Sequence, residues 1–315
     1  MVQKGKNDCF KRLTIEDIAT DFLTKAKTRL KESTFSRYSF ICKRHIIPYF
    51  QCLELHSINN STINSFIQGK LSNGSLSGNP MSPKTVNDMV SLLMQIIKSH
   101  CQFELDIEKP SCRLKEVSVF TETEYNKLKT YLSIGTDTSK LGIITAMLTG
   151  VRIGELCALK WENIDLENGT LLIDKTIQRV ENTDNSQDSK TKIIIDTPKS
   201  NASVRTIPIP TILLIKLRKF KSPENSYVLT NTEKFIEPRI YQRHFKGYLQ
   251  DCNIRDNNFH TLRHTFATMA ISRGMDIKTL SVLLGHTDVG FTMKRYVHPN
   301  IEHKRAQIEK MAVGF

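Results

Sequence analysis

Five segments in the C-terminal half of the chain carry side chains that together could cleave a phosphodiester. They contribute two arginines, a lysine, two histidines and a tyrosine: Arg152, Arg263, Lys199, His260, His286 and Tyr296. An arginine can hold two non-bridging phosphate oxygens at once and keeps its charge at neutral pH. A tyrosine hydroxyl is a weak nucleophile at that pH and needs cations beside it to attack. The combination predicts phosphodiester chemistry without a metal, although each residue alone would be weak support.

Tyr296 is the predicted nucleophile, although a tyrosine near the end of a chain is more often a packed aromatic residue with a hydrated hydroxyl. Arg152 and Arg263 would stabilise the extra negative charge of a pentacoordinate phosphorane. The alternative is that both arginines are solvated at the surface. Arg152 argues against this alternative, because it follows a Thr–Gly turn and lies between two apolar runs.

Lys199 lies in a predicted turn, where a lysine is usually only solvated. We predict that it is the general acid that protonates the leaving 5′-oxygen. Lys190 and Lys192 are its rivals, in a less structured segment. His286 follows Gly285 and could donate a hydrogen bond to a phosphate oxygen; the alternative is a helix that ends at the glycine and leaves the histidine exposed.

His260 and Arg263 are three residues apart at the start of a predicted helix and therefore share a face. His264 is four residues from His260, so a zinc-binding pair is the alternative to phosphate chemistry. No glutamate follows His260 and no third ligand is evident, so we expect neither a metal nor another cofactor. The seven cysteines are widely spaced without a Cys-x-x-Cys pair, and indicate neither a disulfide framework nor a zinc site.

The composition is that of an ordered globular protein, with 39% hydrophobic and 24% charged residues among 315. The longest largely apolar stretch, 141–151, is well short of the roughly 18 residues that a membrane span needs. Residues 1–11 lack the apolar segment of a signal peptide. We therefore expect a cytoplasmic protein that does not enter a membrane.

Positive charge is spread over the whole chain, whose net charge is +13. Residues 1–120 carry 17 Lys and Arg against 11 Asp and Glu, and residues 121–315 carry 28 against 21. An ordinary basic enzyme would fit these counts. The sharper interpretation is that both halves bind one polyanion, in which case affinity would depend strongly on salt.

The predicted elements divide the chain into two domains of different type. Residues 13–103 have helical periodicity, beginning at a capping box in which Asp17 follows Thr14 by three residues, and Pro48 is expected to end the second helix. A linker is predicted over 104–120, and a second capping box, Thr121 with Glu124, opens the next domain, 121–300.

This second domain is predicted to mix helices with a small antiparallel sheet. Strands are expected at 169–173, 193–195 and 204–208, the last two joined by a turn over 198–203, while 181–192 is expected to be a loop. Helical patterns cover the ranges 122–132, 139–148, 211–220, 238–251, 261–273, 276–284 and 290–296. The fold class is therefore mainly α with a small antiparallel β-sheet.

The six candidate residues, in this order along the chain, closely resemble the active site of the tyrosine recombinase (phage integrase) family. The His260-x-x-Arg263 pair and the Leu-Leu-Gly-His segment that ends at His286, ten residues before Tyr296, are its most specific motifs. Residues 13–103 resemble the family's helical, SAM-like core-binding domain on weaker motifs. Residues 121–300 resemble its mixed α/β catalytic domain.

The resemblance implies a site-specific DNA recombinase. Tyr296 would form a 3′-phosphotyrosyl bond and free a 5′-hydroxyl, with Lys199 as general acid and without ATP. The other four candidate residues would bind and polarise the phosphate, and His260 would assist deprotonation of the tyrosine. Glu155 occupies the family's acidic position and would orient the site from behind it.

The resemblance also implies partners. Double-stranded DNA would be clamped between the two domains, and a homotetramer would exchange strands through a Holliday junction during integration or excision of a mobile element. Accessory DNA-bending or directionality factors would assist, and the protein would be associated with the bacterial nucleoid. The tail, 301–315, would dock on a neighbouring protomer.

One departure from many integrases is that only about a dozen residues precede the first predicted helix. We therefore expect either a simple two-domain recombinase or a chain from which an N-terminal arm-binding domain is missing. Two other functions stay open at this point. A type IB-like topoisomerase would share the chemistry without sequence specificity, and a non-catalytic architectural protein would bind DNA without forming a covalent adduct.

Overall fold

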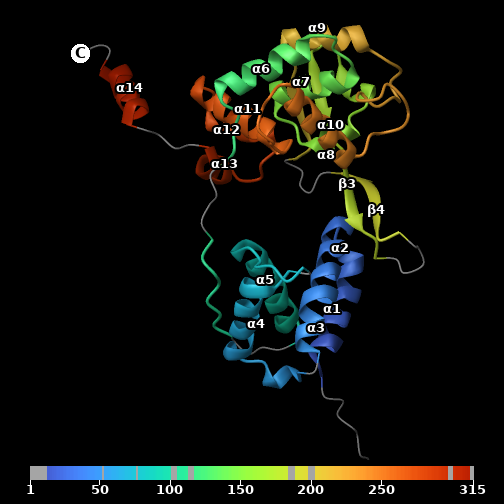
Figure 1. Cartoon of the computed structure of the whole chain (residues 1–315), viewed down its shortest axis with the longest axis vertical. Coiled ribbons are helices and arrows are strands. Elements are labelled where there is room, and N and C mark those ends of the chain that lie inside the picture. Colours follow the sequence, from blue (N-terminus) through green and yellow to red (C-terminus); the bar gives the residue numbers. More distant parts are fainter. Residues whose placement is uncertain are drawn as a thin grey trace, which may run out of the picture. The chain divides into compact units, whose positions relative to one another are not determined.

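The computed structural model describes residues 13–51, 53–75, 77–100, 105–112, 117–183, 189–197, 203–296 and 301–312 (Figure 1). The chain forms two compact units. The first consists of Met1–Lys115 with Val180–Lys192, and the second of Glu116–Arg179 with Ile193–Phe315. The predicted class, mainly helical with small antiparallel sheets, is confirmed.

The first unit is a helical bundle around an apolar core. Its main helices are α1 (Ile15–Arg29), α2 (Glu32–Ile41), α3 (Ile47–Phe50), α4 (Asn60–Asn73) and α5 (Pro83–Lys98). Helix α5 contributes most to the core, with seven buried side chains on one face of its 16 residues. Thr14 and Asp17 form the predicted capping box at the start of α1, and Ser82 caps α5 as expected.

Pro48 does not end the second helix, contrary to the prediction. The backbone continues from α2 through a π-helical segment η1 (Cys42–Ile46) into α3, where Pro48 lies in the first turn. A proline in a first turn needs no hydrogen-bond donor. In the wider π turn, the Ile47 amide donates to the Cys42 carbonyl. The helical backbone therefore continues through Pro48, where the sequence predicts that it ends.

The second unit carries nine further α-helices among the described residues. These are α6 (Glu122–Ser133), α7 (Thr138–Thr149), α8 (Ile153–Ala158), α9 (Thr211–Phe220), α10 (Pro238–Asp251), α11 (His260–Ser272), α12 (Ile277–Leu284), α13 (Val289–Tyr296) and α14 (Ile301–Ala312). Thr121 and Glu124 form the predicted capping box of α6. Helix α7 lies at the centre: it packs against α6, α8, α9, α10 and α11, and seven consecutive residues, 141–147, are buried.

Two small antiparallel sheets complete the fold, and their pairing differs from the prediction. Strands β1 (Ile164–Asp165), β2 (Thr170–Ile173) and β5 (Arg205–Pro208) form one sheet in the order β1-β2-β5. Strand β4 (Thr191–Asp196) pairs instead with β3 (Thr176–Glu181), which was not predicted. Residues 193–195 and 204–208 are therefore both strands, as expected, but they belong to different sheets.

The end of the β3–β4 hairpin belongs to the first unit, where it contacts α2. The Ser36 hydroxyl donates to the Glu181 carbonyl at 2.9 Å, and Lys192 forms an ion pair with Glu32. Residues 181–192 were predicted as a loop. Their described part instead continues β3 and begins β4, with 184–188 outside the described residues.

Two helices end at glycines in the left-handed conformation, and both ends face the candidate site. Gly150 follows α7 with φ +67°, and Gly285 follows α12 with φ +64°. A Cβ atom on Gly150 would lie 2.6 Å from the Phe266 ring and 3.0 Å from a Leu284 methyl group. Only glycine meets both the dihedral and the steric requirement at this point, which brings α7, α11 and α12 together.

The substitution Gly150→Ala should therefore lower the free energy of unfolding of the second unit by at least about 1 kcal/mol, from backbone strain alone. Trp161, the chain's one tryptophan and a buried residue of this unit, reports its unfolding by fluorescence in urea. Gly247→Ala is the matched control, because a Cβ atom there meets nothing within 4 Å inside α10 and alanine favours a helix. Equal effects of the two substitutions would contradict this account of Gly150.

Candidate active site

The second unit brings five of the six predicted residues into one region. Arg152 immediately precedes α8, His260 and Arg263 lie in the first turns of α11, His286 follows α12, and Tyr296 ends α13. Lys199, the predicted general acid, lies outside the described residues, which break off between 197 and 203. The other five residues all lie in the described part of the chain.

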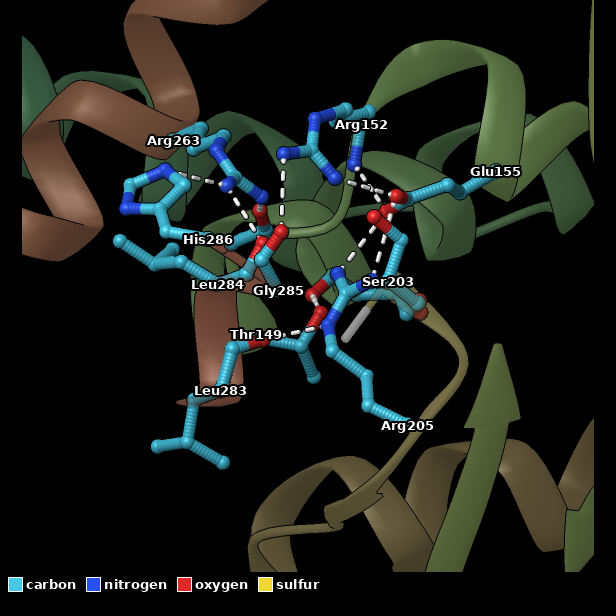
Figure 2. A network of polar contacts seen from close by, with 12 residues as sticks. Thr149, Arg152, Glu155, Ser203, Arg205, Arg263, Leu283, Leu284, Gly285 and His286 are labelled. Carbon is cyan, nitrogen blue, oxygen red and sulfur yellow. Dashed lines mark hydrogen bonds and ion pairs between the residues drawn. The ribbon is translucent and has the colours of Figure 1, made fainter. Parts of the chain in front are cut away.

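A buried carboxylate links two arginines at the base of the site (Figure 2). Glu155 is 3% exposed and bonds the Arg205 guanidinium through both oxygens, at 2.9 and 3.2 Å. It also accepts from the Arg152 side chain at 2.6 Å and from the Arg152 amide at 2.9 Å. Burial raises the pKa of the carboxyl, but the hydrogen bonds and charges of Arg205 and the charge of Arg152 together lower it to about 2. Glu155 is therefore ionised and fixes both guanidinium groups.

Three arginines bind consecutive carbonyls at the C-terminal end of α12, as Figure 2 shows. Arg205 donates to the Leu283 carbonyl at 2.6 Å, Arg263 to that of Leu284 at 2.6 Å, and Arg152 to that of Gly285 at 3.5 Å. The last carbonyls of a helix have no partner inside the helix and carry partial negative charge. Guanidinium groups satisfy these carbonyls here, so the end of α12 holds the arginines in place.

Arg263 is the most deeply buried of these arginines, at 2% exposure. It also donates to the Gly150 carbonyl at 2.9 Å, so it joins the ends of α7 and α12. Burial, followed by the charge of Arg152, lowers the pKa of its guanidinium to about 9, so that it stays charged at neutral pH. With Arg152 and Arg205 it gives three positive charges against the single negative charge of Glu155, which favours an anion.

His286 is half-buried between Arg263 and α13. Its Nε2 lies 2.9 Å from the Arg263 guanidinium and its Nδ1 lies 2.7 Å from the Thr292 hydroxyl. Because arginine can only donate, Nε2 must accept, and Nδ1–H donates to Thr292. Burial and the charges of Arg263 and Arg152 lower the pKa of His286 to about 4, in keeping with a neutral ring. To donate to a phosphate, Nε2 must first release the Arg263 hydrogen bond and gain a proton.

The hydroxyl of Tyr296 lies against a histidine. His264 Nδ1 is 2.8 Å from the Tyr296 oxygen, and the tyrosine is 7% exposed, in a buried cluster that includes Leu280 and Leu284 of α12. Burial raises the pKa of the phenol, while the charges of Arg263, Arg295 and Arg152 lower it, with a net increase. The phenol is therefore protonated in the free protein at neutral pH.

His260 reaches the rest of the site through a ring contact. Its ring packs edge-to-face against that of His264, with centroids 4.5 Å apart and an interplanar angle of 89°. The side chain is exposed, whereas Arg263 on the same helix is buried. Partial withdrawal from water and the charges of His264, Arg263, Arg152 and Arg295 lower the pKa of His260, which favours a neutral ring.

The zinc alternative for His260 and His264 finds no further ligand. Among the described residues, no three His, Cys, Asp or Glu side chains are grouped so that they could hold a metal ion. In the same part of the chain, no helix is both long and apolar enough to cross a membrane.

Comparison with known proteins identifies the family. Residues 118–303 match the family model described as the phage integrase family, and residues 14–71 match the model of its N-terminal SAM-like domain. The chain belongs to the phage integrase family. The resemblance inferred from the sequence motifs is thereby confirmed.

Two curated relatives cover most of this integrase-family chain. A XerC-like tyrosine recombinase of Caldanaerobacter subterraneus subsp. tengcongensis is 27% identical, over 98% of this chain and 85% of the relative. The ICEBs1 integrase of Bacillus subtilis is 22% identical, over 90% of this chain and 79% of the relative.

Solved integrase structures share the fold. The Tn1549 transposon integrase in complex with transposon right end DNA superposes with a TM-score of 0.74 at 20% identity, covering 95% of this chain and all of that one. A lambda integrase tetramer bound to a Holliday junction gives 0.61 at 17% identity, covering 93% of this chain and 80% of that one.

Sequence reasoning did not assign three residues that this integrase-family site contains: Arg205, His264 and Thr292. Arg205 had a detectable signal, since in the alternation of β5 it lies on the same buried face as Ile207. A charged residue on the core face of a strand needs a partner, and Glu155 supplies it. The sequence presents His264 only as a possible zinc ligand, and no sequence signal marks Thr292.

Replacing the buried carboxylate tests its role in the structure. Glu155→Gln keeps the shape but leaves Arg152 and Arg205 without their counter-charge, so the free energy of unfolding of the second unit should decrease by about 3 kcal/mol. Urea unfolding followed by Trp161 fluorescence measures the change. Glu162→Gln is the control, because Glu162 pairs with Lys160 at 4.0 Å near the surface and should cost under about 0.5 kcal/mol. A small effect at Glu155 would contradict the proposed charge balance.

Proposed function

We propose that this protein is a site-specific DNA recombinase that cuts and rejoins DNA through a 3′-phosphotyrosyl intermediate. The observation that carries the proposal is a tyrosine hydroxyl under the influence of two charged arginines, one buried and one partly exposed. Tyr296 is held by His264, and both Arg263 and Arg152 act electrostatically on its phenol. Family membership supports the same reaction class.

The charges of the site support the proposed reaction. The guanidinium groups of Arg152 and Arg263 bind the non-bridging oxygens of the scissile phosphate, with His260 and His286 beside them. Glu155 and the helix ends hold the arginines rigidly. The guanidinium groups therefore stabilise the added charge of the phosphorane without having to reorganise. The tyrosyl oxygen forms a bond to phosphorus, and the bond from phosphorus to the 5′-oxygen breaks.

The phosphotyrosyl bond keeps the energy of the phosphodiester, so a 5′-hydroxyl of another strand can reverse the step without ATP. Lys199 is the proposed general acid for the leaving 5′-oxygen. The arginines take the part that a metal ion plays in other phosphoryl-transfer enzymes. We expect the reaction to need neither a metal nor a nucleotide.

Both domains are proposed to bind the same duplex. We take residues 13–103 as a core-binding domain, 104–120 as the linker and 121–300 as the catalytic domain, with excess positive charge on each side of the linker. Affinity should then fall steeply with salt. The DNA complex reported for the Tn1549 integrase supports a DNA partner. Integration or excision of a mobile element at the nucleoid, assisted by accessory factors, is the role that we infer.

Tyr296→Phe should bind DNA as the wild type does and form no covalent adduct, because only the nucleophilic oxygen is lost. The measurement incubates each protein with fragmented genomic DNA of the host and its mobile elements. Adducts that survive denaturant are then isolated and sequenced. Tyr131→Phe is the matched control, since that hydroxyl bonds Asp251 away from the site and its loss should leave adducts unchanged.

Each outcome of this trapping separates the candidate functions. Wild-type adducts at one short site, absent from the variant, support a recombinase and give its target. Adducts scattered over all fragments would instead indicate a type IB-like topoisomerase. Tight binding without adducts would indicate an architectural protein and contradict the proposal.

Assembly on DNA is proposed to depend on the tail, 301–315. Helix α14 exposes Ile301, Ile308 and Met311, which are 71%, 67% and 80% accessible. The first two are seven residues apart and share a face of the helix, and Met311 lies close to that face. Such side chains are normally covered by a partner. A second copy of the chain is the partner we infer, since the lambda integrase forms a tetramer on a Holliday junction.

Deleting 301–315 should leave binding of one copy to a half-site unchanged but reduce assembly of four copies on paired sites, because the apolar face is removed. Mass measurement of the protein–DNA complexes by light scattering reports both. The substitutions Ile308→Ser and Met311→Ser should have the same effect without shortening the chain. Intact tetramers in the deletion variant would count against docking by the tail.

A further inference from the structure

The Tyr296 hydroxyl has one hydrogen-bond partner among the described residues, and that partner is not a residue to which we assigned a role in the reaction. It is His264 Nδ1, on the neighbouring helix α11, at 2.8 Å. His260, the histidine expected to assist the tyrosine, contacts the ring of His264 instead. His264 therefore lies between His260 and the proposed nucleophile.

The direction of this hydrogen bond follows from the protonation states. Burial, followed by the charges of Arg295 and Arg263, lowers the pKa of His264 to about 4, so its ring is neutral at pH 7. A neutral imidazole has one donor nitrogen and one acceptor nitrogen. If Nδ1 were the donor, the phenol proton would have no described acceptor in a largely buried position, which is costly. The hydroxyl therefore donates to Nδ1.

We propose that His264 is the general base that takes the phenolic proton of Tyr296 during strand cleavage, an inference that rests on the proposed recombinase reaction. Nδ1 already accepts that proton in a hydrogen bond. As the tyrosyl oxygen bonds to phosphorus, the proton passes to Nδ1, while the leaving 5′-oxygen receives a different proton from the general acid. In the reverse step Nδ1 returns its proton to the tyrosyl oxygen.

The charged groups around His264 adjust its basicity when DNA binds. Helix α11 contributes His260 and Arg263, helix α13 contributes Arg295 and Tyr296, and the adjoining part of α12 is apolar. A phosphate on Arg263 offsets one of the two cations that lower the pKa of His264. The imidazole therefore becomes a stronger base when the substrate is in place, and the proton moves as attack proceeds.

The first experiment needs no DNA. Long-range proton–nitrogen NMR of histidine-labelled protein distinguishes a protonated from an unprotonated ring nitrogen. We expect Nδ1 of His264 to be unprotonated at pH 7, and its chemical shift to change in Tyr296→Phe, which removes the donor. A proton found on Nδ1 would overturn the proposal.

The second experiment uses the DNA site recovered with wild-type adducts. His264→Gln keeps a hydrogen-bond acceptor but cannot take a proton, so it separates positioning of the tyrosine from base catalysis. Single-turnover cleavage should slow about a hundredfold or more, with the Kd for DNA unchanged. Cleavage by His264→Gln at the wild-type rate would overturn the proposal.

Substrate chemistry distinguishes a base from the general acid. A substrate with sulfur in place of the bridging 5′-oxygen has a leaving group that needs no proton. It should restore cleavage by Lys199→Ala but not by His264→Gln. Restoration of both variants would assign His264 to the leaving-group side and overturn the proposal.

The dependence of the cleavage rate on pH distinguishes a general base from a purely structural role of His264. The rate should fall as His264 becomes protonated at low pH, and this limb should be absent in His264→Gln. Arg295→Gln removes a cation that lowers the pKa of His264, so the limb should move to higher pH. An unmoved limb would overturn the proposal. If wild-type protein forms no adduct on any DNA, the recombinase function fails, while the NMR result still decides the hydrogen bond.

Discussion

The buried carboxylate of Glu155 is the constraint on which the site depends. Three guanidinium groups lie close together here, and Arg205 and Arg263 are almost fully buried. Like charges in a poorly hydrated region repel strongly, so the arrangement needs an anion inside it. Glu155 is this anion, and it is buried. The Arg152 side chain is 36% exposed, so its exposed part stays available to a second anion.

The same arginines connect elements that are distant in the sequence. Arg263 joins the ends of α7 and α12, and Arg205 joins β5 to α12. The carbonyls that they bind are the unpaired ends of helices, stopped by Gly150 and Gly285. Loss of a helix end would therefore disturb the arginines as much as loss of their counter-ion. Fold stability and the proposed phosphate binding would rest on the same contacts, so the arginines are held in place in the free protein.

Sequence patterns could predict structure that depends on neighbouring residues in the chain. They could not predict strand pairing or side-chain contacts between segments distant in the sequence. The capping boxes at Thr14 and Thr121 and the ranges of α9 and α10 follow from short-range rules. The partner of β4 did not follow, because periodicity identifies a strand without saying which strand it pairs with. Five of the six predicted site residues converge, because the spacing of their motifs reflects the fold, whereas Lys199 lies outside the described residues. The contact between His264 and Tyr296 could not be predicted, because it depends on α13, which places the Tyr296 hydroxyl beside His264.

The protonation states of the free protein would keep the proposed nucleophile, Tyr296, unreactive in the absence of DNA. Burial raises the pKa of Tyr296, and His264 and His286 are neutral. The Nε2 atom of His286 accepts from Arg263 and therefore cannot donate to a phosphate in this arrangement. A bound phosphodiester would change each of these conditions, since its charge attracts the guanidinium protons and raises the proton affinity of both histidines. The substrate would thus bring about the protonation states that its own cleavage needs. Without a phosphate in the site, the Tyr296 phenol would stay protonated.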